Sequence, residues 1–225
     1  FLHTDGGVMY NADHVQRPAD MCGKTISYPG SPGPGGPAIV QTMVEADGKM
    51  DCDLKSYGKY NGGFFHTQAL EEGKADLATL IFWNFEIPEA QTRNNLNVSF
   101  FSLKDWGVPD FCQLVLMTTP ERFRERKEGL RKLVLALRKA TAVIHQNPQL
   151  AKDYYRQHVG ADDQDDLDEN IVLEATLTAT LPAFPNDFMM ATEYYQNLMQ
   201  WLVGTNQVDS HANETSVSEY WTNEI

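Results

Sequence analysis

Short apolar runs alternate with amphipathic stretches in the first half of the chain, and this pattern predicts strands alternating with helices. Residues 23–28 alternate apolar and polar side chains, as a half-buried strand does. Residues 75–82 form a nearly continuous apolar run, which is typical of a strand buried on both faces. The other elements expected here are strands at 8–10, 53–60, 98–103 and 111–118 and helices at 38–46, 63–72 and 88–93.

Helical periodicity dominates the second half. A long helix is predicted at 120–147, where Asn147-Pro148 stops it, and further helices are predicted at 149–157, 167–178 and 186–203. Strands that alternate with helices and are followed by helices alone indicate an α/β fold with a parallel-type sheet and a helical C-terminal part.

Length and charge exclude several classes of protein. The 225 residues suit one large domain or two small lobes. A formal net charge of -13 argues against a nucleic-acid partner, because phosphate binding needs clustered Lys and Arg. No apolar run approaches the ~20 residues that a membrane-spanning helix needs, so we do not expect the chain to span a membrane.

The cysteines argue against a zinc centre and a disulfide framework. Cys22, Cys52 and Cys112 are an odd number without CxxC spacing. One disulfide with a spare thiol remains open. We expect no metal and no cofactor.

A glycine- and proline-rich loop at 28–37 joins a predicted strand to a predicted helix. Its glycines allow backbone to approach a ligand closely, and a helix N-terminus suits an anionic group. Ser31, Gly33, Gly35 and Gly36 are therefore candidate ligand contacts. A proline-stiffened surface loop is the alternative, and the segment alone does not decide between them.

Candidate side chains also follow the apolar run at 75–82. Trp83, Asn84 and Glu86 stand where that strand ends, and open α/β sheets bind ligands at the carboxyl ends of their strands. Trp83 offers a stacking face and Glu86 an acceptor for amino groups. A core tryptophan and a helix-capping glutamate are the alternative. Trp106 and Asp110, in a turn flanked by aromatic residues, are weaker candidates.

The order of these segments resembles the thiamine-precursor family. This family includes bacterial substrate-binding proteins for formyl-aminopyrimidines, related alkanesulfonate and riboflavin-type binders, and the fungal thiamine-pyrimidine synthase. The segments that carry the resemblance are GKTI at 23–26, GKADLA at 73–78, WNFEIPEA at 83–90, KDWGVPDF at 104–111 and the helix with NPQLA at 138–152. The resemblance covers about 21–152 well and the later helices loosely.

The resemblance implies a two-lobed, periplasmic-binding-protein-like fold of type II, with the ligand between the lobes. Residues 1–100 would form most of the second lobe with a crossing strand. Residues 101–225 would return to the first lobe and add C-terminal helices. Because family members start with a βαβ segment of the first lobe, the start of that lobe is expected to be missing here.

The same resemblance implies roles for the candidate residues. Ser31 and the loop glycines match a loop that contacts anionic or polar groups. Trp83, Asn84 and Glu86 match the motif that contacts the heterocycle and its amino groups, and Trp106 and Asp110 lie near the return crossing.

The implied function is binding of a small nitrogenous heterocycle, such as a thiamine pyrimidine precursor, by an ABC-transporter-type solute-binding protein. It would be periplasmic or extracellular in that role and organellar or cytoplasmic otherwise, with a transporter permease or a larger assembly as protein partner. The expectation is a protein that is not an enzyme.

Two alternatives stay open. The first is a binding-protein-like domain that serves as a structural subunit of a larger assembly. The second is a pyrimidine synthase of thiamine biosynthesis, but nothing in the chain resembles the cysteine-rich iron-binding segment of the fungal synthase. His66, the only histidine near the proposed cleft, is more typical of a packed side chain.

Overall fold

The computed structural model describes residues 6–28, 33–63, 65–92, 95–110, 114–158, 167–211 and 221–225. Ser31 and Cys112 lie outside these residues.

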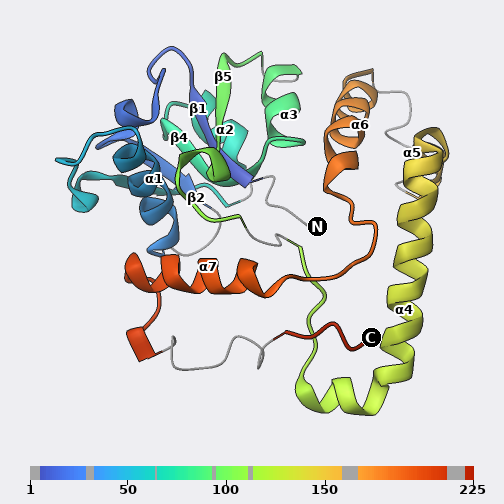
Figure 1. Cartoon of the computed structure of the whole chain (residues 1–225). Helices are drawn as coiled ribbons and strands as arrows, with labels where there is room; N and C mark the ends of the chain where they lie inside the picture. The colour runs from blue at the N-terminus through green and yellow to red at the C-terminus, as the bar shows by residue number, and fades with distance from the viewer. Residues whose placement is uncertain are drawn as a thin grey trace.

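A mixed sheet of five strands forms the centre of the first half (Figure 1). The strand order is β3-β2-β4-β1-β5. β2 pairs in parallel with β3 and β4, whereas β1 pairs antiparallel with both β4 and β5. The strands are β1 (Gly6–Asn11), β2 (Thr25–Tyr28), β3 (Gly58–Asn61), β4 (Leu77–Phe82) and β5 (Val98–Ser102). The sheet is thus parallel in one half and antiparallel around β1.

Helices cover both faces of this sheet. Each strand contributes side chains to both faces, because successive residues of a strand point to opposite sides. Val8 belongs to the core cluster that also contains residues of α1 (Gly35–Ala46), and its neighbour Met9 belongs to the cluster with α2 (His66–Glu71). α3 (Glu86–Thr92) adds Ala90 to the second cluster. β4 lies inside the sheet with Leu77 and Ala78 fully buried, so its apolar sequence follows from burial on both faces.

Four helices make up the described part of the second half: α4 (Pro120–Gln146), α5 (Pro148–His158), α6 (Leu167–Thr180) and α7 (Thr192–Gly204). α4 and α5 stand beside the sheet-bearing part, and α7 passes below α1 (Figure 1). α6 contacts α3, and the indole Nε1–H of Trp201 in α7 donates to Thr42 Oγ1 of α1 at 3.1 Å. The helical part therefore joins the sheet-bearing part through α6 and α7.

Some predicted elements differ from the structure. The strand expected at 53–60 is a 3-10 turn, Leu54–Ser56, followed by β3, because the side chain of Asp53 accepts from the N–H of Lys55 and caps that turn. The helix expected at 186–203 begins only at Thr192, after a loop in which Phe188 has a φ of 62°. Where it is described, the segment expected as a strand at 111–118 has no sheet partner and forms no strand.

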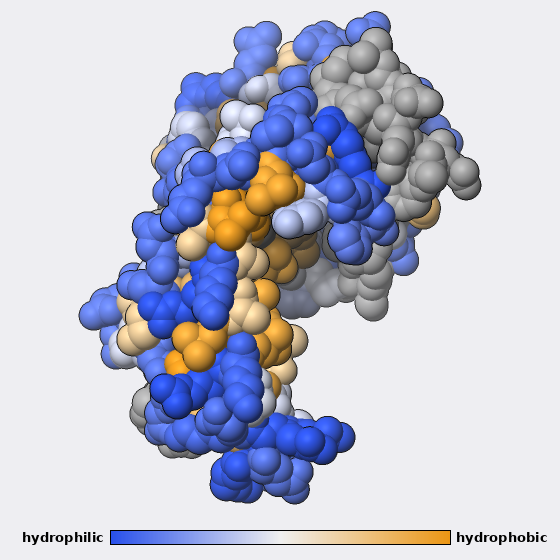
Figure 2. Space-filling view, turned by 90° about the vertical axis from the view of Figure 1, so that its right-hand side faces the viewer, coloured by the Kyte–Doolittle hydropathy of each residue, from blue (hydrophilic) through white to orange (hydrophobic). Residues whose placement is uncertain are grey.

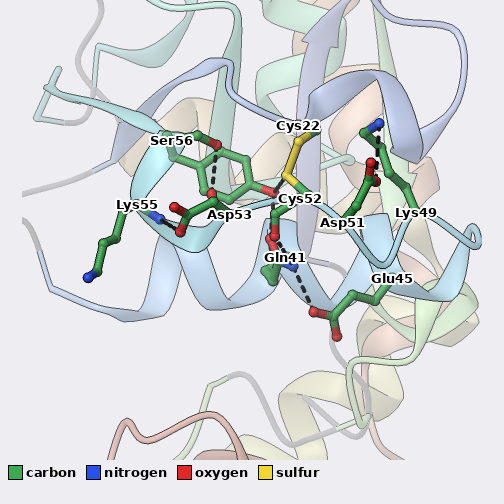
Figure 3. The surroundings of a disulfide bond; sticks show 10 residues. Cys22, Gln41, Glu45, Lys49, Asp51, Cys52, Asp53, Lys55 and Ser56 are labelled. Atoms are coloured by element: carbon green, nitrogen blue, oxygen red, sulfur yellow. Dashed lines mark hydrogen bonds and ion pairs between the residues drawn. A yellow bond between two sulfur atoms is a disulfide. The ribbon is translucent and has the colours of Figure 1, made fainter.

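A disulfide between Cys22 and Cys52 joins the end of the 3-10 turn Pro18–Met21 to the loop after α1 (Figure 3). The two Cα atoms are 5.8 Å apart. Beside it, Gln41 Nε2 donates to the carbonyl oxygen of Cys52 at 3.1 Å, and the Tyr57 hydroxyl donates to Gln41 Oε1 at 2.9 Å. The single disulfide that the sequence left open is thus present, and it ties the turn before β2 to the loop after α1.

We expect that removing this disulfide lowers the free energy of unfolding by about 3–4 kcal/mol, because a bond spanning 30 residues restricts the unfolded chain. The test is chemical denaturation of Cys22→Ser/Cys52→Ser beside the oxidised and reduced wild type. Reduction should add nothing to the double variant. Cys112→Ser, which leaves the pair intact, is the matched control, and an unchanged midpoint in the double variant would contradict the expectation.

Candidate functional site

A cleft of about 360 Å³ lies between the sheet-bearing part and the end of α6. One wall consists of residues from the turn after β4, from β5 and from the 3-10 turn Leu103–Trp106, and the other comes from the end of α6 and the turn that follows it. The residues that line it are Trp83, Phe100, Ser102, Lys104, Asp105, Ala179 and Pro182. Aromatic, hydroxyl and charged groups of both signs therefore meet in one hollow.

Trp83 is the predicted site residue that this cleft contains. It directly follows β4, and 40% of its surface is exposed. The pairing of β1 with β4 skips Leu80, which takes a φ of 61°, so β4 carries a bulge. A bulge changes which side of a strand the following residues face, and here Ile81 stays fully buried while Trp83 is exposed in the cleft wall.

Asn84, the next residue, is buried rather than exposed. Its Nδ2 donates to Thr180 Oγ1 at the end of α6, while its buried Oδ1 has no hydrogen-bond partner in the described part of the chain. A buried acceptor left without a donor is costly. Asn84 thus holds the turn after β4 against α6, and it does not itself line the cleft.

Glu86 begins α3, and its carboxylate accepts from the backbone N–H of Phe82 at 2.9 Å. Burial raises the pKa of Glu86, and the hydrogen bonds from the backbone N–H groups of Phe82 and Glu86 oppose that rise. The geometry matches the capping alternative. One carboxylate oxygen is engaged by the backbone, and contact with a ligand stays a prediction.

Of the described candidates, none other than Trp83 lines this cleft. The ring of Trp106 meets Phe101 edge-on, with centroids 6.0 Å apart, and packs against the core on the α1 side. Asp110 is half-buried further along the chain. Lys104 and Asp105, in the same motif as Trp106, face the cleft instead. Sequence reasoning missed both residues, because the direction of their side chains depends on the short 3-10 turn.

The loop glycines take different positions around α1. A Cβ on Gly33 would meet nothing within 4 Å, whereas one on Gly35 would come within 3.3 Å of Gln207 Oε1. A Cβ on Gly36 would lie 3.0 Å from Thr79 Oγ1 of β4. Gly36 therefore allows the start of α1 to pack closely on the sheet, and α1 begins at Gly35 rather than at the predicted residue 38.

His66 is packed inside the sheet-bearing part. Only 2% of its surface is exposed, and its Nδ1 lies 3.1 Å from the Ser27 hydroxyl. Burial lowers the pKa of His66 to about 4. The ring is neutral in the folded protein near neutral pH and does not line the cleft.

This burial predicts an acid-sensitive contribution to stability. Below pH 6.5 the unfolded chain takes up a proton at His66, but the folded chain does not until about pH 4. The contribution of the neutral His66 ring to the free energy of unfolding is therefore complete above pH 6.5. It falls by about 3 kcal/mol as the pH drops through 4. Chemical denaturation at pH values between 7 and about 4 should show that the free energy of unfolding declines less in His66→Gln than in wild type. His14→Gln, at an exposed histidine, is the control, and equal declines in all three proteins would refute the assignment.

Comparison with known proteins identifies the family. The family model described as "NMT1/THI5 like" matches residues 1–151. The chain belongs to the NMT1/THI5-like family. The formylaminopyrimidine-binding protein of Halalkalibacterium halodurans is 31% identical over 145 residues, which are 64% of this chain and 42% of that protein. The chain thus spans less than half the length of this relative.

A solved structure shows the same fold. The alkanesulfonate-binding protein SsuA from Xanthomonas axonopodis pv. citri, bound to MOPS, superposes with a TM-score of 0.60 over 92% of this chain and 66% of that one, at 12% identity. The predicted periplasmic-binding-protein-like α/β fold is confirmed.

The described residues include no helix with the length and apolar character to cross a membrane, and no cluster of His, Cys, Asp and Glu suited to hold a metal ion.

Proposed function

We propose that this member of the NMT1/THI5-like family binds a small nitrogenous heterocycle, such as a thiamine pyrimidine precursor, in the cleft beside Trp83. The observation that carries the proposal is the exposed indole of Trp83 in the wall of a cleft between the sheet and α6. An indole face stacks on flat heterocycles. The name of the relative, a formylaminopyrimidine-binding protein, supports this class of ligand.

The cleft supplies polar partners for such a ligand. Lys104 can donate to a ring nitrogen or a carbonyl, and Asp105 can accept from an exocyclic amino group. The hydroxyl of Ser102 in the same wall can donate or accept. Flat stacking with a few directed polar groups is the usual composition of a site for a small organic ligand.

Binding rather than catalysis is the role we assign. The relatives named above are binding proteins, and His66 is sealed away from the cleft with a pKa of about 4. The pyrimidine synthase alternative would need a reactive histidine that a ligand can reach. It is distinguished by iron-dependent formation of pyrimidine product, which we expect this chain not to show.

A position outside the cytoplasm, with delivery of the ligand to an ABC-transporter permease, completes the proposal. The disulfide between Cys22 and Cys52 supports it, because such bonds persist in oxidising compartments and are rare in the cytosol. On this proposal residues 1–100 form most of one lobe and 101–225 lead back toward the other.

The proposal predicts that Trp83→Ala weakens binding of formylaminopyrimidine about 5- to 150-fold, because stacking on an aromatic side chain contributes about 1–3 kcal/mol per base. Isothermal titration calorimetry measures the dissociation constant directly. Phe85→Ala is the matched control, since Phe85 is also exposed and lies two residues further along but does not line the cleft.

The wild-type titration tests the proposed function itself. Heat of binding and a raised melting temperature are expected with formylaminopyrimidine, and their absence with that compound and with a panel of related vitamin precursors would reject the proposal. Equal losses in Trp83→Ala and Phe85→Ala would keep the ligand but move it away from this cleft.

The role of a subunit in a larger assembly is a second candidate. An exposed apolar groove in the helical part favours it. Stable association with another polypeptide, without heat from any small ligand, would distinguish this role from that of a free binding protein.

A further inference from the structure

A second hollow, an apolar groove of about 310 Å³, lies in the helical part of the chain. Its sides are the run 114–116, the residues Val134 and Leu137 of α4, the loop before α7 with Met189, and the segment that contains Ile225. Figure 2 shows hydrophobic residues gathered in a band on the face where α4 and α5 lie. Sites for small organic ligands have volumes of roughly 300–1,000 Å³ and mostly apolar walls, so this groove has the size and lining of such a site.

α4 makes one wall of the groove positively charged. Between residues 130 and 146 this helix carries four Lys and Arg residues and no acid, although the formal net charge of the chain is -13. One of them, Arg138, lines the groove itself. Arg131 precedes it by about two helical turns and so lies on the same side of α4. A local excess of positive charge favours an anionic partner on this side of the helix.

The other polar side chains of the lining are already bonded to the backbone that shapes the groove. Asp187 Oδ1 accepts from the backbone N–H of Met189 at 3.0 Å. Thr222 Oγ1 accepts from a backbone N–H at 3.1 Å. Asn223 accepts from the N–H of Met190 at 3.0 Å and donates to its carbonyl oxygen at 2.9 Å. These three side chains therefore hold the two loops of the groove in place.

Arg138 is the exception. Within the described ranges its guanidinium forms no hydrogen bond and no ion pair, although it stands among apolar residues. A guanidinium has only donors to offer, and a carboxylate matches them in a bidentate pair. The groove thus combines an apolar channel with one unpaired cation at its wall.

We propose that this groove is a binding site for a single-chain anionic amphiphile, such as a medium-chain fatty acid. The hydrocarbon chain lies against Val134, Leu137 and the run 114–116, and the carboxylate binds Arg138. The site is separate from the cleft beside Trp83, because no residue lines both hollows. The proposal therefore does not rest on the heterocycle proposed above.

Two other occupants fit the groove less well. A second copy of the chain carries the same formal net charge of -13, and two copies repel one another. A flat membrane surface does not fill a concave groove, whereas a single hydrocarbon chain does.

Isothermal titration calorimetry with octanoate and with 1-octanol tests the proposal, because the two probes share a chain length and differ in charge. We expect one octanoate per chain, bound about 5-fold more tightly than 1-octanol, since an exposed ion pair contributes modestly. Arg138→Gln should remove this difference by weakening octanoate alone. Arg122→Gln is the matched control: Arg122 is also exposed on α4 but does not line the groove, and both affinities should stay unchanged.

The apolar part of the site is tested separately. Leu116→Asp should weaken octanoate and 1-octanol alike, about 10-fold or more, because it places a charge in the apolar wall. Leu54→Asp is the control, since Leu54 is exposed to a similar degree but belongs to the 3-10 turn after α1. Circular dichroism of all variants checks that they fold.

Several results would overturn the proposal. They are the absence of octanoate binding, uptake of many octanoate molecules per chain, and an octanoate affinity that Arg138→Gln and Arg122→Gln change equally. Self-association of the chain that Leu116→Asp abolishes would make a second copy the occupant. Binding to phosphatidylglycerol vesicles without one-to-one binding of octanoate would make a membrane surface the partner.

Discussion

The pairing of β1 with two strands at once is the constraint on which the cleft depends. β1 lies antiparallel between β4 and β5, so its register sets both the turn that carries Trp83 and the strand that carries Phe100. Gly7 faces Ser102 across this pairing, and a Cβ on Gly7 would come within 2.3 Å of the Phe100 ring. The missing side chain at Gly7 is therefore what allows the aromatic wall to lie over the sheet.

The polar neighbours of Trp83 fix the backbone around it and do not line the cleft themselves. Glu86 binds the backbone at the end of β4, and Asn84 binds α6. Trp83 and Phe85 are left as the exposed groups of this turn, and of the two only Trp83 lines the cleft. This arrangement separates two tasks within four residues. Buried polar side chains fix the backbone, and a fixed backbone can present a flat apolar face without rearrangement when a ligand arrives.

Much of the α/β half follows from local pattern. The apolar run of β4, the alternation in β2 and the helix between them are visible in the sequence, because burial on one or both faces leaves a period in the chain. Trp83 was singled out as a candidate for the same reason, since it follows the strand end. Lys104, Asp105 and Phe100 were not proposed as site residues, because their position in the cleft depends on a 3-10 turn and on long-range register. The segment 114–117 has the composition of a strand, but strand formation needs a partner, and composition cannot reveal whether one is at hand. Whether Ser31 contacts a ligand stays a prediction.

The hydrogen bond between Asn84 and Thr180 ties the turn after β4 to the end of α6. The turn that carries Trp83 is thus bound to the last residue of α6. Near that residue, Ala179 and Pro182 form the opposite wall of the cleft. Widening the gap between the walls would therefore strain this bond, and a molecule that fits one width stabilises one placement of α6. The width of the cleft and the position of α6 are therefore coupled through this one hydrogen bond.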